Sequence, residues 1–195
     1  MSIDKISKII TQSIQVKQDL LSNSECIQKI NMVVEVITKA FKNGNSVYFA
    51  GNGGSAADAQ HIAAELSGRF YTDRAPLYAE ALHVNSSYMT AVANDYSYDV
   101  VYSRMIEGCG RKGDILVGIS TSGNSKNVVK ALEKAEEKGM ITISMTGNGG
   151  GKMKELSKHL LNVPSNDTPR IQECHILIGH IICQLVEEKL FPTQA

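Results

Sequence analysis

Apolar residues in the first 42 positions recur every three or four residues, which is the spacing of one face of a helix. This pattern predicts a helix from Asp4 to about Leu21 and a second helix from about Glu25 to Lys42, followed by the capping signal Asn43-Gly44. Two helices before the first strand have more apolar surface than one sheet face needs. They therefore either pack against another subunit or form a helical layer within the chain.

From residue 45 onward, short apolar runs typical of buried strands alternate with helical patterns. Strands are expected at Val47–Ala50, Tyr78–Leu82, Ile115–Ile119, Ile141–Met145 and His159–Val163. Helices are expected at Ala56–Leu66, Tyr88–Ala93 (capped by Ser86-Ser87 and followed by the polar loop Asn94-Asp95), Asp99–Glu107, Val128–Lys138, Lys152–Ser157 and Arg170–Leu190. The alternation predicts an α/β fold with a mostly parallel sheet. We expect a single domain over residues 1–195, with a helical extension over 1–44 and an α/β core over 45–195.

Composition narrows the classes of function. Twenty basic residues balance twenty acidic ones, and this zero net charge argues against broad nucleic-acid binding. The N-terminus is polar and no apolar run approaches the length of a membrane span, so we expect neither a secretion signal nor a membrane partner. The four cysteines have no Cys-x-x-Cys spacing and lie in apolar surroundings. A reduced, cytoplasmic protein with buried thiols is the simplest interpretation.

The stretch after the first expected strand is rich in glycine. Gly51-Asn52-Gly53-Gly54 allows positive φ angles and close approach of the backbone to a ligand, and Ser55 is a good N-cap for the helix that follows. A strand, a glycine loop and a helix N-terminus together direct free N–H groups at one point, which suits an anion. Tight strand-to-helix turns also need glycine for steric reasons alone, so this loop by itself is only suggestive.

The helix after this loop has a pair of chemically versatile side chains. His61 and Glu65 are four residues apart and therefore emerge on one face of the helix. Such a pair can bind a metal ion or transfer protons. It can equally be a solvated helix face with an incidental His–Glu contact.

A second polar loop follows the expected strand Ile115–Ile119. Its sequence Ser120-Thr121-Ser122-Gly123-Asn124-Ser125 has four hydroxyl residues in six positions before a helix. Hydroxyls and backbone N–H groups at a helix N-terminus can bind phosphate without positive charge, although serine and threonine also cap ordinary helices. Neither this loop nor the glycine loop is a Walker motif, and residues 51–56 lack the G-x-G-x-x-G spacing.

The closing helix has polar residues within an otherwise apolar sequence. Gln172 and His180 fall about 80° apart around the helix axis, two turns apart along one side. A lone histidine in such a helix is commonly a hydrogen-bonded core residue. Together with His61 and Glu65, however, these two residues make a plausible set of four ligands.

Five stretches of the chain form a combination that is informative as a whole. They are GNGGSAADAQHIAAELSGR (51–69), AND (93–95), GISTSGNS (118–125), GMITISMTGNGGGKM (139–153) and RIQECHILIGH (170–180). This combination resembles the sugar isomerase (SIS) domain family and, within it, the bacterial phosphoheptose isomerases. The resemblance implies a three-layer SIS fold and an aldose–ketose isomerase. It would convert sedoheptulose 7-phosphate to D-glycero-D-manno-heptose 7-phosphate through an enediol, for lipopolysaccharide or another glycan.

The resemblance also implies roles for individual residues. It assigns one Zn²⁺ per subunit to His61, Glu65, Gln172 and His180, with Glu65 and His180 as the acid–base pair. Around the sugar phosphate it places Asn52, Gly53, Gly54, Ser55, Glu65, Arg69, Asn94, Asp95, Ser120, Thr121, Ser122, Ser125 and Gln172. The resemblance further implies a homotetramer in which the N-terminal helices bundle and the sites lie between subunits. In one departure, this chain has Pro169 where some relatives have an acidic residue before Arg-Ile-Gln.

Two rival functions remain. SIS proteins that bind the bacterial replication initiator resemble these isomerases closely, and Ser13–Gln15 and Lys189–Gln194 are similar to that group. Those adaptors lack the glutamate and the second histidine of the metal set, whereas this chain has Glu65 and His180. The other rival is a different SIS enzyme or a sugar-phosphate-sensing regulator. A regulator would normally include a DNA-binding domain, for which this sequence leaves no room.

Overall fold

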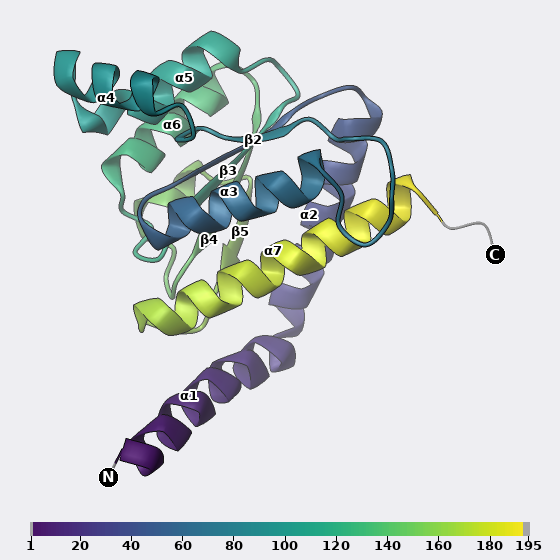
Figure 1. Cartoon of the computed structure of the whole chain (residues 1–195), viewed down its shortest axis with the longest axis vertical. Helices are drawn as coiled ribbons and strands as arrows, with labels where there is room; N and C mark the ends of the chain where they lie inside the picture. Colours follow the sequence, from purple (N-terminus) through teal and green to yellow (C-terminus); the bar gives the residue numbers. More distant parts are fainter. Residues whose placement is uncertain (1, 193–195) are drawn as a thin grey trace.

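Five parallel strands form one sheet with helices on both faces in the computed structural model, which describes residues 2–192 (Figure 1). The strands are β1 (Val47–Gly51), β2 (Ala79–Ala81), β3 (Ile115–Ser120), β4 (Ile141–Thr146) and β5 (His159–Asn162). The α-helices are α1 (Ser2–Ser22), α2 (Ser24–Lys42), α3 (Gly54–Ser67), α4 (Ser86–Asp95), α5 (Val101–Cys109), α6 (Lys126–Glu137) and α7 (Thr168–Leu190). Two 3₁₀ helices, η1 (Tyr98–Val100) and η2 (Gly151–Leu156), complete the list.

The strand order is β2-β1-β3-β4-β5, so the chain moves outward from β1 in one direction and then in the other. Val47 of β1 pairs with Ala79 of β2 on one side and with Ile115 of β3 on the other. In parallel sheets with this order, ligands bind beyond the carboxyl ends of the strands where the direction reverses, here between β1 and β3. The two polar loops predicted from the sequence follow these two strands.

Side chains of the central strands alternate between two separate apolar cores. Ile115, Val117 and Ile119 of β3 contact the core that includes α2, α3 and α7, whereas Leu116 contacts the core with α5 and α6. This alternation is the period-two pattern of a strand buried on both faces. Figure 1 shows the resulting three layers, and the predicted α/β fold with a parallel sheet and flanking helices is confirmed.

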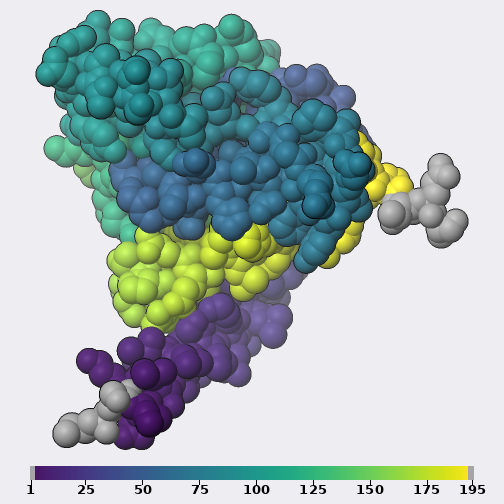
Figure 2. Space-filling model, in the orientation of Figure 1, coloured from purple at the N-terminus to yellow at the C-terminus, as the bar shows by residue number. Residues whose placement is uncertain are grey.

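Helix α1 projects away from these layers (Figures 1 and 2). Its isoleucines are largely exposed, from 75% at Ile3 down to 42% at Ile9. The predicted amphipathic helix is therefore present, and within residues 2–192 most of its apolar face is uncovered. No helix in this part of the chain is both long and apolar enough to cross a bilayer.

Some predicted boundaries near the site are wrong. Helix α3 begins at Gly54, because the carbonyl of Gly53 accepts the first helical N–H groups, so Ser55 lies in the first turn and is not the N-cap. Asn94-Asp95 is the end of α4 and not a loop, and the cap of this helix is Asn85, whose Oδ1 accepts from the Tyr88 N–H at 3.0 Å. Asparagine is as good an N-cap as serine, so the sequence did not distinguish these neighbours.

Two further boundaries differ by a few residues. The expected helix from Asp99 begins as η1, and α5 starts at Val101. Helix α7 begins at Thr168 and has Pro169 in its first turn, where the missing N–H of proline costs no hydrogen bond. Of the segment Lys189–Gln194, the last two residues lie outside the described part of the chain.

Candidate active site

Three side chains from two helices meet beside the sheet. His61 Nε2 lies 3.0 Å from Glu65 Oε1 on α3, and 3.4 Å from His180 Nε2 on α7. Their ligand atoms all lie within 4.8 Å of one another, and the two imidazole rings are 5.0 Å apart at 73°. We call His61, Glu65 and His180 the cluster. It is partly open to solvent, since 48% of the His61 side chain and 26% of the Glu65 side chain are exposed.

Close packing of α3 on α7 brings the cluster together. At Gly179 of α7, a Cβ atom would lie only 2.5 Å from Ile62 Cδ1, so any side chain there would force Ile62 or the helices to shift. One turn later, the Cys183 thiol lies 3.9 Å from the Ile62 carbonyl oxygen. Because His61 is next to Ile62 and His180 is next to Gly179, the two imidazoles are placed opposite one another at this contact.

The donor set fits a zinc ion. Two imidazole nitrogens and one carboxylate oxygen are ligands that catalytic zinc sites use, with a fourth position left for water or substrate. Nitrogens bound at about 2.05 Å to one tetrahedral ion are roughly 3.3 Å apart. The 3.4 Å separation of the two Nε2 atoms matches that value. His61, Glu65 and His180 could therefore hold such an ion with little rearrangement.

Gln172, the fourth predicted ligand, lies apart from the cluster. A Cβ atom on Gly54 would be 2.5 Å from Gln172 Nε2, so this amide packs at the N-terminus of α3. His61 is seven residues further along α3, and His180 is eight residues beyond Gln172 on α7, which correspond to roughly 10–12 Å along either helix. Within one chain, the structure thus brings together three of the four residues.

The glycine loop (51–55) and the loop Ser120–Ser125, which we call the hydroxyl loop, follow the neighbouring strands β1 and β3. The amides of Asn52 and Asn127 bind each other reciprocally, with N–O distances of 2.8 and 2.9 Å, and so join the first loop to the start of α6. Within the hydroxyl loop, Ser120 Oγ lies 2.9 Å from Ser125 Oγ and 3.4 Å from Ser122 Oγ. The hydroxyls predicted to bind phosphate therefore do lie together.

The remaining predicted residues are more scattered. Ser55 is buried in the first turn of α3, and Thr121 is half-buried in the hydroxyl loop. Asn94 and Asp95 are exposed at the end of α4, where the Asn94 amide donates to the Asp95 carboxylate at 2.9 Å. Arg69 is exposed just after α3. The roles of these residues stay predictions.

Two residues beside the glycine loop were not predicted. The Tyr98 hydroxyl donates to Asn52 Oδ1 at 3.1 Å, and Asn127 is 3% exposed with its amide facing the same residue. Both orient Asn52. No local sequence signal identifies them, because each contact joins segments at least 46 positions apart.

The other histidine of α7, His175, has a structural role. His175 is fully buried, and its Nε2 lies 3.1 Å from the Thr146 carbonyl oxygen at the end of β4. Burial lowers its pKa to about 4, which keeps the ring neutral near pH 7. His175 thus faces the sheet, whereas His180, five positions later, belongs to the cluster.

Comparison with known proteins supports the sequence motifs. A SIS domain model matches residues 2–147. The chain is 50% identical over 188 residues to a phosphoheptose isomerase from Aneurinibacillus thermoaerophilus, covering 96% of this chain and 95% of the relative. It is 54% identical over 180 residues to phosphoheptose isomerase 2 from Campylobacter jejuni, covering 92% and 89% of the two chains. The structure resembles phosphoheptose isomerase GmhA from Neisseria gonorrhoeae, with a TM-score of 0.90, 40% identity and coverage of 96% and 100%.

Proposed function

The chain belongs to the SIS-domain family and, within it, to the phosphoheptose isomerases, and from this premise we propose that it converts sedoheptulose 7-phosphate to D-glycero-D-manno-heptose 7-phosphate with the help of Zn²⁺. The coarser statement, that it is a sugar-phosphate isomerase, follows from its family. The observation that carries the finer proposal is the convergence of His61, Glu65 and His180. We propose that residues 1–195 act as one SIS domain in the cytoplasm.

Aldose–ketose isomerisation moves a proton between two adjacent carbons through an enediol, and it needs a base for carbon and an acid for oxygen. In our proposal, Glu65 accepts the carbon-bound proton and later returns it to the neighbouring carbon. His180 exchanges a proton with the substrate oxygens. When bound, Zn²⁺ supplies Lewis-acid stabilisation of the negative charge that develops on oxygen.

The two loops at the carboxyl ends of β1 and β3 would anchor the phosphate. Hydroxyl groups of the hydroxyl loop and the glycine-loop backbone are neutral donors at helix N-termini, which suit an anion. Ser55, Thr121 and Arg69 complete this group, and Asn94 and Asp95 contact the sugar hydroxyls. Binding energy from the phosphate end would then hold the reacting carbons in place.

We further propose a homotetramer with sites between subunits. The exposed isoleucines of α1 form an apolar face that bundling with other copies would cover. Gln172 is roughly 10 Å or more from the cluster along the helices of its own chain. As a fourth zinc ligand, it would therefore come from a neighbouring copy. Mixing His180→Ala with Gln172→Ala subunits should then restore activity that each variant lacks alone.

The test of the proposed activity is incubation of the purified protein with sedoheptulose 7-phosphate while aldose formation is followed. We expect turnover that a chelator abolishes and added Zn²⁺ restores. Metal analysis of His61→Ala and His180→Ala should show zinc loss in both variants. Turnover that is insensitive to the chelator, or full zinc content in both variants, would contradict the metal site.

The alternative function, an adaptor for the replication initiator, has less support. The adaptors that this chain resembles lack the glutamate and the second histidine of the metal set. Here, in contrast, Glu65 and His180 converge on His61. An inactive wild-type protein that nevertheless binds the initiator would favour the adaptor.

A further inference from the structure

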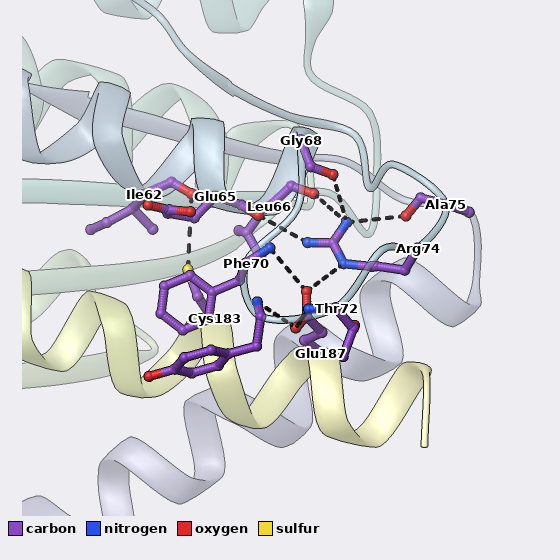
Figure 3. A network of polar contacts seen from close by, with 11 residues as sticks. Ile62, Glu65, Leu66, Gly68, Phe70, Thr72, Arg74, Ala75, Cys183 and Glu187 are labelled. Atoms are coloured by element: carbon purple, nitrogen blue, oxygen red, sulfur yellow. Dashed lines mark hydrogen bonds and ion pairs between the residues drawn. The ribbon is translucent and has the colours of Figure 1, made fainter. Parts of the chain in front are cut away.

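One buried ion pair holds the loop between α3 and β2 in place, and the proposed chemistry makes no use of it (Figure 3). The side chains of Arg74 and Glu187 are 2% and 3% exposed, and Arg74 Nε lies 2.8 Å from Glu187 Oε2. We call this pair with its backbone partners the clasp. Arg74 comes from the loop and Glu187 from α7, so the pair joins segments 113 positions apart.

The carboxylate of the clasp binds the loop backbone. The Glu187 carboxylate oxygens accept hydrogen bonds from the backbone N–H groups of Phe70, Tyr71 and Thr72, with N–O distances of 3.1, 2.8 and 2.9 Å. Burial alone would raise the pKa of Glu187, but the three N–H donors and Arg74 outweigh it and lower the pKa to about 2. The group is therefore a carboxylate at any pH near neutrality. Its hydrogen bonds attach the backbone of residues 70–72 to α7.

The guanidinium of the clasp caps the C-terminal end of α3. Arg74 Nη2 donates to the Glu65 carbonyl oxygen at 2.9 Å, and Nη1 donates to the Leu66 carbonyl oxygen at 2.9 Å. Carbonyl groups in the last turn of a helix have no partner within the helix, so these bonds complete it. They also tie the backbone of Glu65, whose side chain belongs to the cluster, to α7 through Glu187.

The same loop contacts the third member of the cluster. The Phe70 ring, whose backbone N–H is held by Glu187, lies 5.7 Å from the His180 ring, with the ring planes tilted by 31°. Glu187 itself is seven residues beyond His180, roughly 10 Å along α7. The clasp thus touches the backbone of Glu65 and the surroundings of His180, but none of the ligand atoms.

We propose that the Arg74–Glu187 clasp is a positioning element that sets the separation of His61 and Glu65 on α3 from His180 on α7. This inference rests on the proposed metal site. Loss of the clasp would release the end of α3 and the Phe70 ring, and the ligand atoms would lose their close approach. Outer-shell partners of metal ligands commonly contribute about 10–100-fold to metal affinity.

The chain provides a matched control for mere loss of stability. Asp114, 3% exposed, is another buried carboxylate that accepts backbone N–H groups, from Ser46 at 2.9 Å and Arg111 at 2.8 Å. It lies at the start of β3, at the opposite end of the strands from the two loops. Asp114→Asn should destabilise the fold by a similar loss without reaching α3 or α7.

The experiment measures Zn²⁺ affinity of the full chain by competition with a chromophoric chelator, beside the thermal unfolding midpoint. We expect Glu187→Gln and Arg74→Lys to bind Zn²⁺ roughly 10–100-fold more weakly than the wild type. Lysine retains the charge, but its single nitrogen cannot reach the three positions that Nε, Nη1 and Nη2 of Arg74 occupy. Asp114→Asn should lower the midpoint and leave Zn²⁺ affinity within about twofold, since its contacts are remote.

A third variant covers the case in which Glu187→Gln does not fold. Phe70→Leu keeps the clasp and removes only the ring beside His180, and we expect a decrease in Zn²⁺ affinity of about threefold or more. Wild-type affinity in folded Glu187→Gln or Arg74→Lys, or in Phe70→Leu, would overturn the proposal. So would an equal loss in Asp114→Asn. If the wild type binds no Zn²⁺, the proposed metal site itself fails, and this result is distinct from the others.

Discussion

The cluster and the hydroxyl loop differ in how the chain assembles them. His61 and His180 are 119 positions apart, and their 3.4 Å approach depends on the packing of α3 against α7. The hydroxyl loop consists of six consecutive residues whose serines contact each other directly. One site is therefore a product of tertiary packing, and the other is largely a product of local sequence.

They also differ in charge. The cluster consists entirely of ionisable side chains, whereas the hydroxyl loop has none. Neutral hydrogen bonds contribute about 0.5–1.5 kcal/mol each, so losing one of several donors is a partial loss. A group that transfers the proton has no substitute. The comparison thus predicts that loop variants mainly change KM, and that cluster variants mainly change kcat or metal content.

The sharpest test of this division is Glu65→Gln. Glutamine keeps the size of the side chain but cannot act as a base, and general acid–base groups contribute about 10²–10⁴-fold in rate. We expect kcat with sedoheptulose 7-phosphate to fall by that factor, and KM to change little. Glu133→Gln, on the exposed side of α6, is the control and should have wild-type kinetics. Near-normal turnover by Glu65→Gln would remove the catalytic assignment.

Low pH should weaken the clasp beside the cluster, whereas the hydroxyl loop has no ionisable side chain to protonate. The pKa of Glu187 is about 2 in the folded protein and 4.5 ordinarily, so its stabilisation is complete above pH 4.5 and is lost as pH falls toward 2. This loss amounts to about 3 kcal/mol. Urea unfolding between about pH 6 and pH 3 should show a shallower dependence for Glu187→Gln than for the wild type. Equal slopes would contradict the pairing, and Ser120→Ala with Ser122→Ala should keep the wild-type slope.

Much of the fold could be predicted from the sequence because its signals are local. Apolar runs and helical spacing identified all five strands, and the two polar loops were visible as contiguous motifs. The pair His61 and Glu65 also followed from helix periodicity. The place of Gln172 did not, because Gln172 and His180 share one side of α7, about 80° apart, while their positions along the axis differ by about two turns.

The clasp could not have been predicted. Arg74 occurs in a stretch with no helical or strand pattern, and Glu187 occurs beside Glu188 and Lys189 in what looks like a solvated helix end. Only the packing of the loop on α7 shows that both side chains are buried. The same limit applies to Asn127, whose bond to Asn52 spans 75 positions.

The hydroxyl loop can be tested by removing two of its donors. Ser120→Ala with Ser122→Ala should raise KM by roughly tenfold, because two neutral hydrogen bonds to phosphate are lost, while kcat changes little. Ser144→Ala, a buried serine on β4 outside the loop, controls for the loss of a hydroxyl in the sheet. An unchanged KM would show that phosphate binds elsewhere, and a large fall in kcat alone would contradict the separation of anchoring from chemistry.

The smallest expected effect is that of salt on KM. Raising ionic strength from about 0.05 to 0.5 M shortens the range of electrostatic interactions from more than 10 Å to less than 8 Å, which weakens exposed charge pairs. Fixed hydroxyl and backbone donors act at hydrogen-bond distance, so KM for the sugar phosphate should change by less than about threefold over this range. Among the predicted phosphate contacts, Arg69 is an exposed cation whose contribution would depend on salt. If KM rises steeply with salt in the wild type and not in Arg69→Ala, then charge on Arg69, and not the hydroxyl loop, dominates phosphate binding. A flat dependence in both proteins would leave the anchoring to neutral donors, as the comparison of the two regions requires.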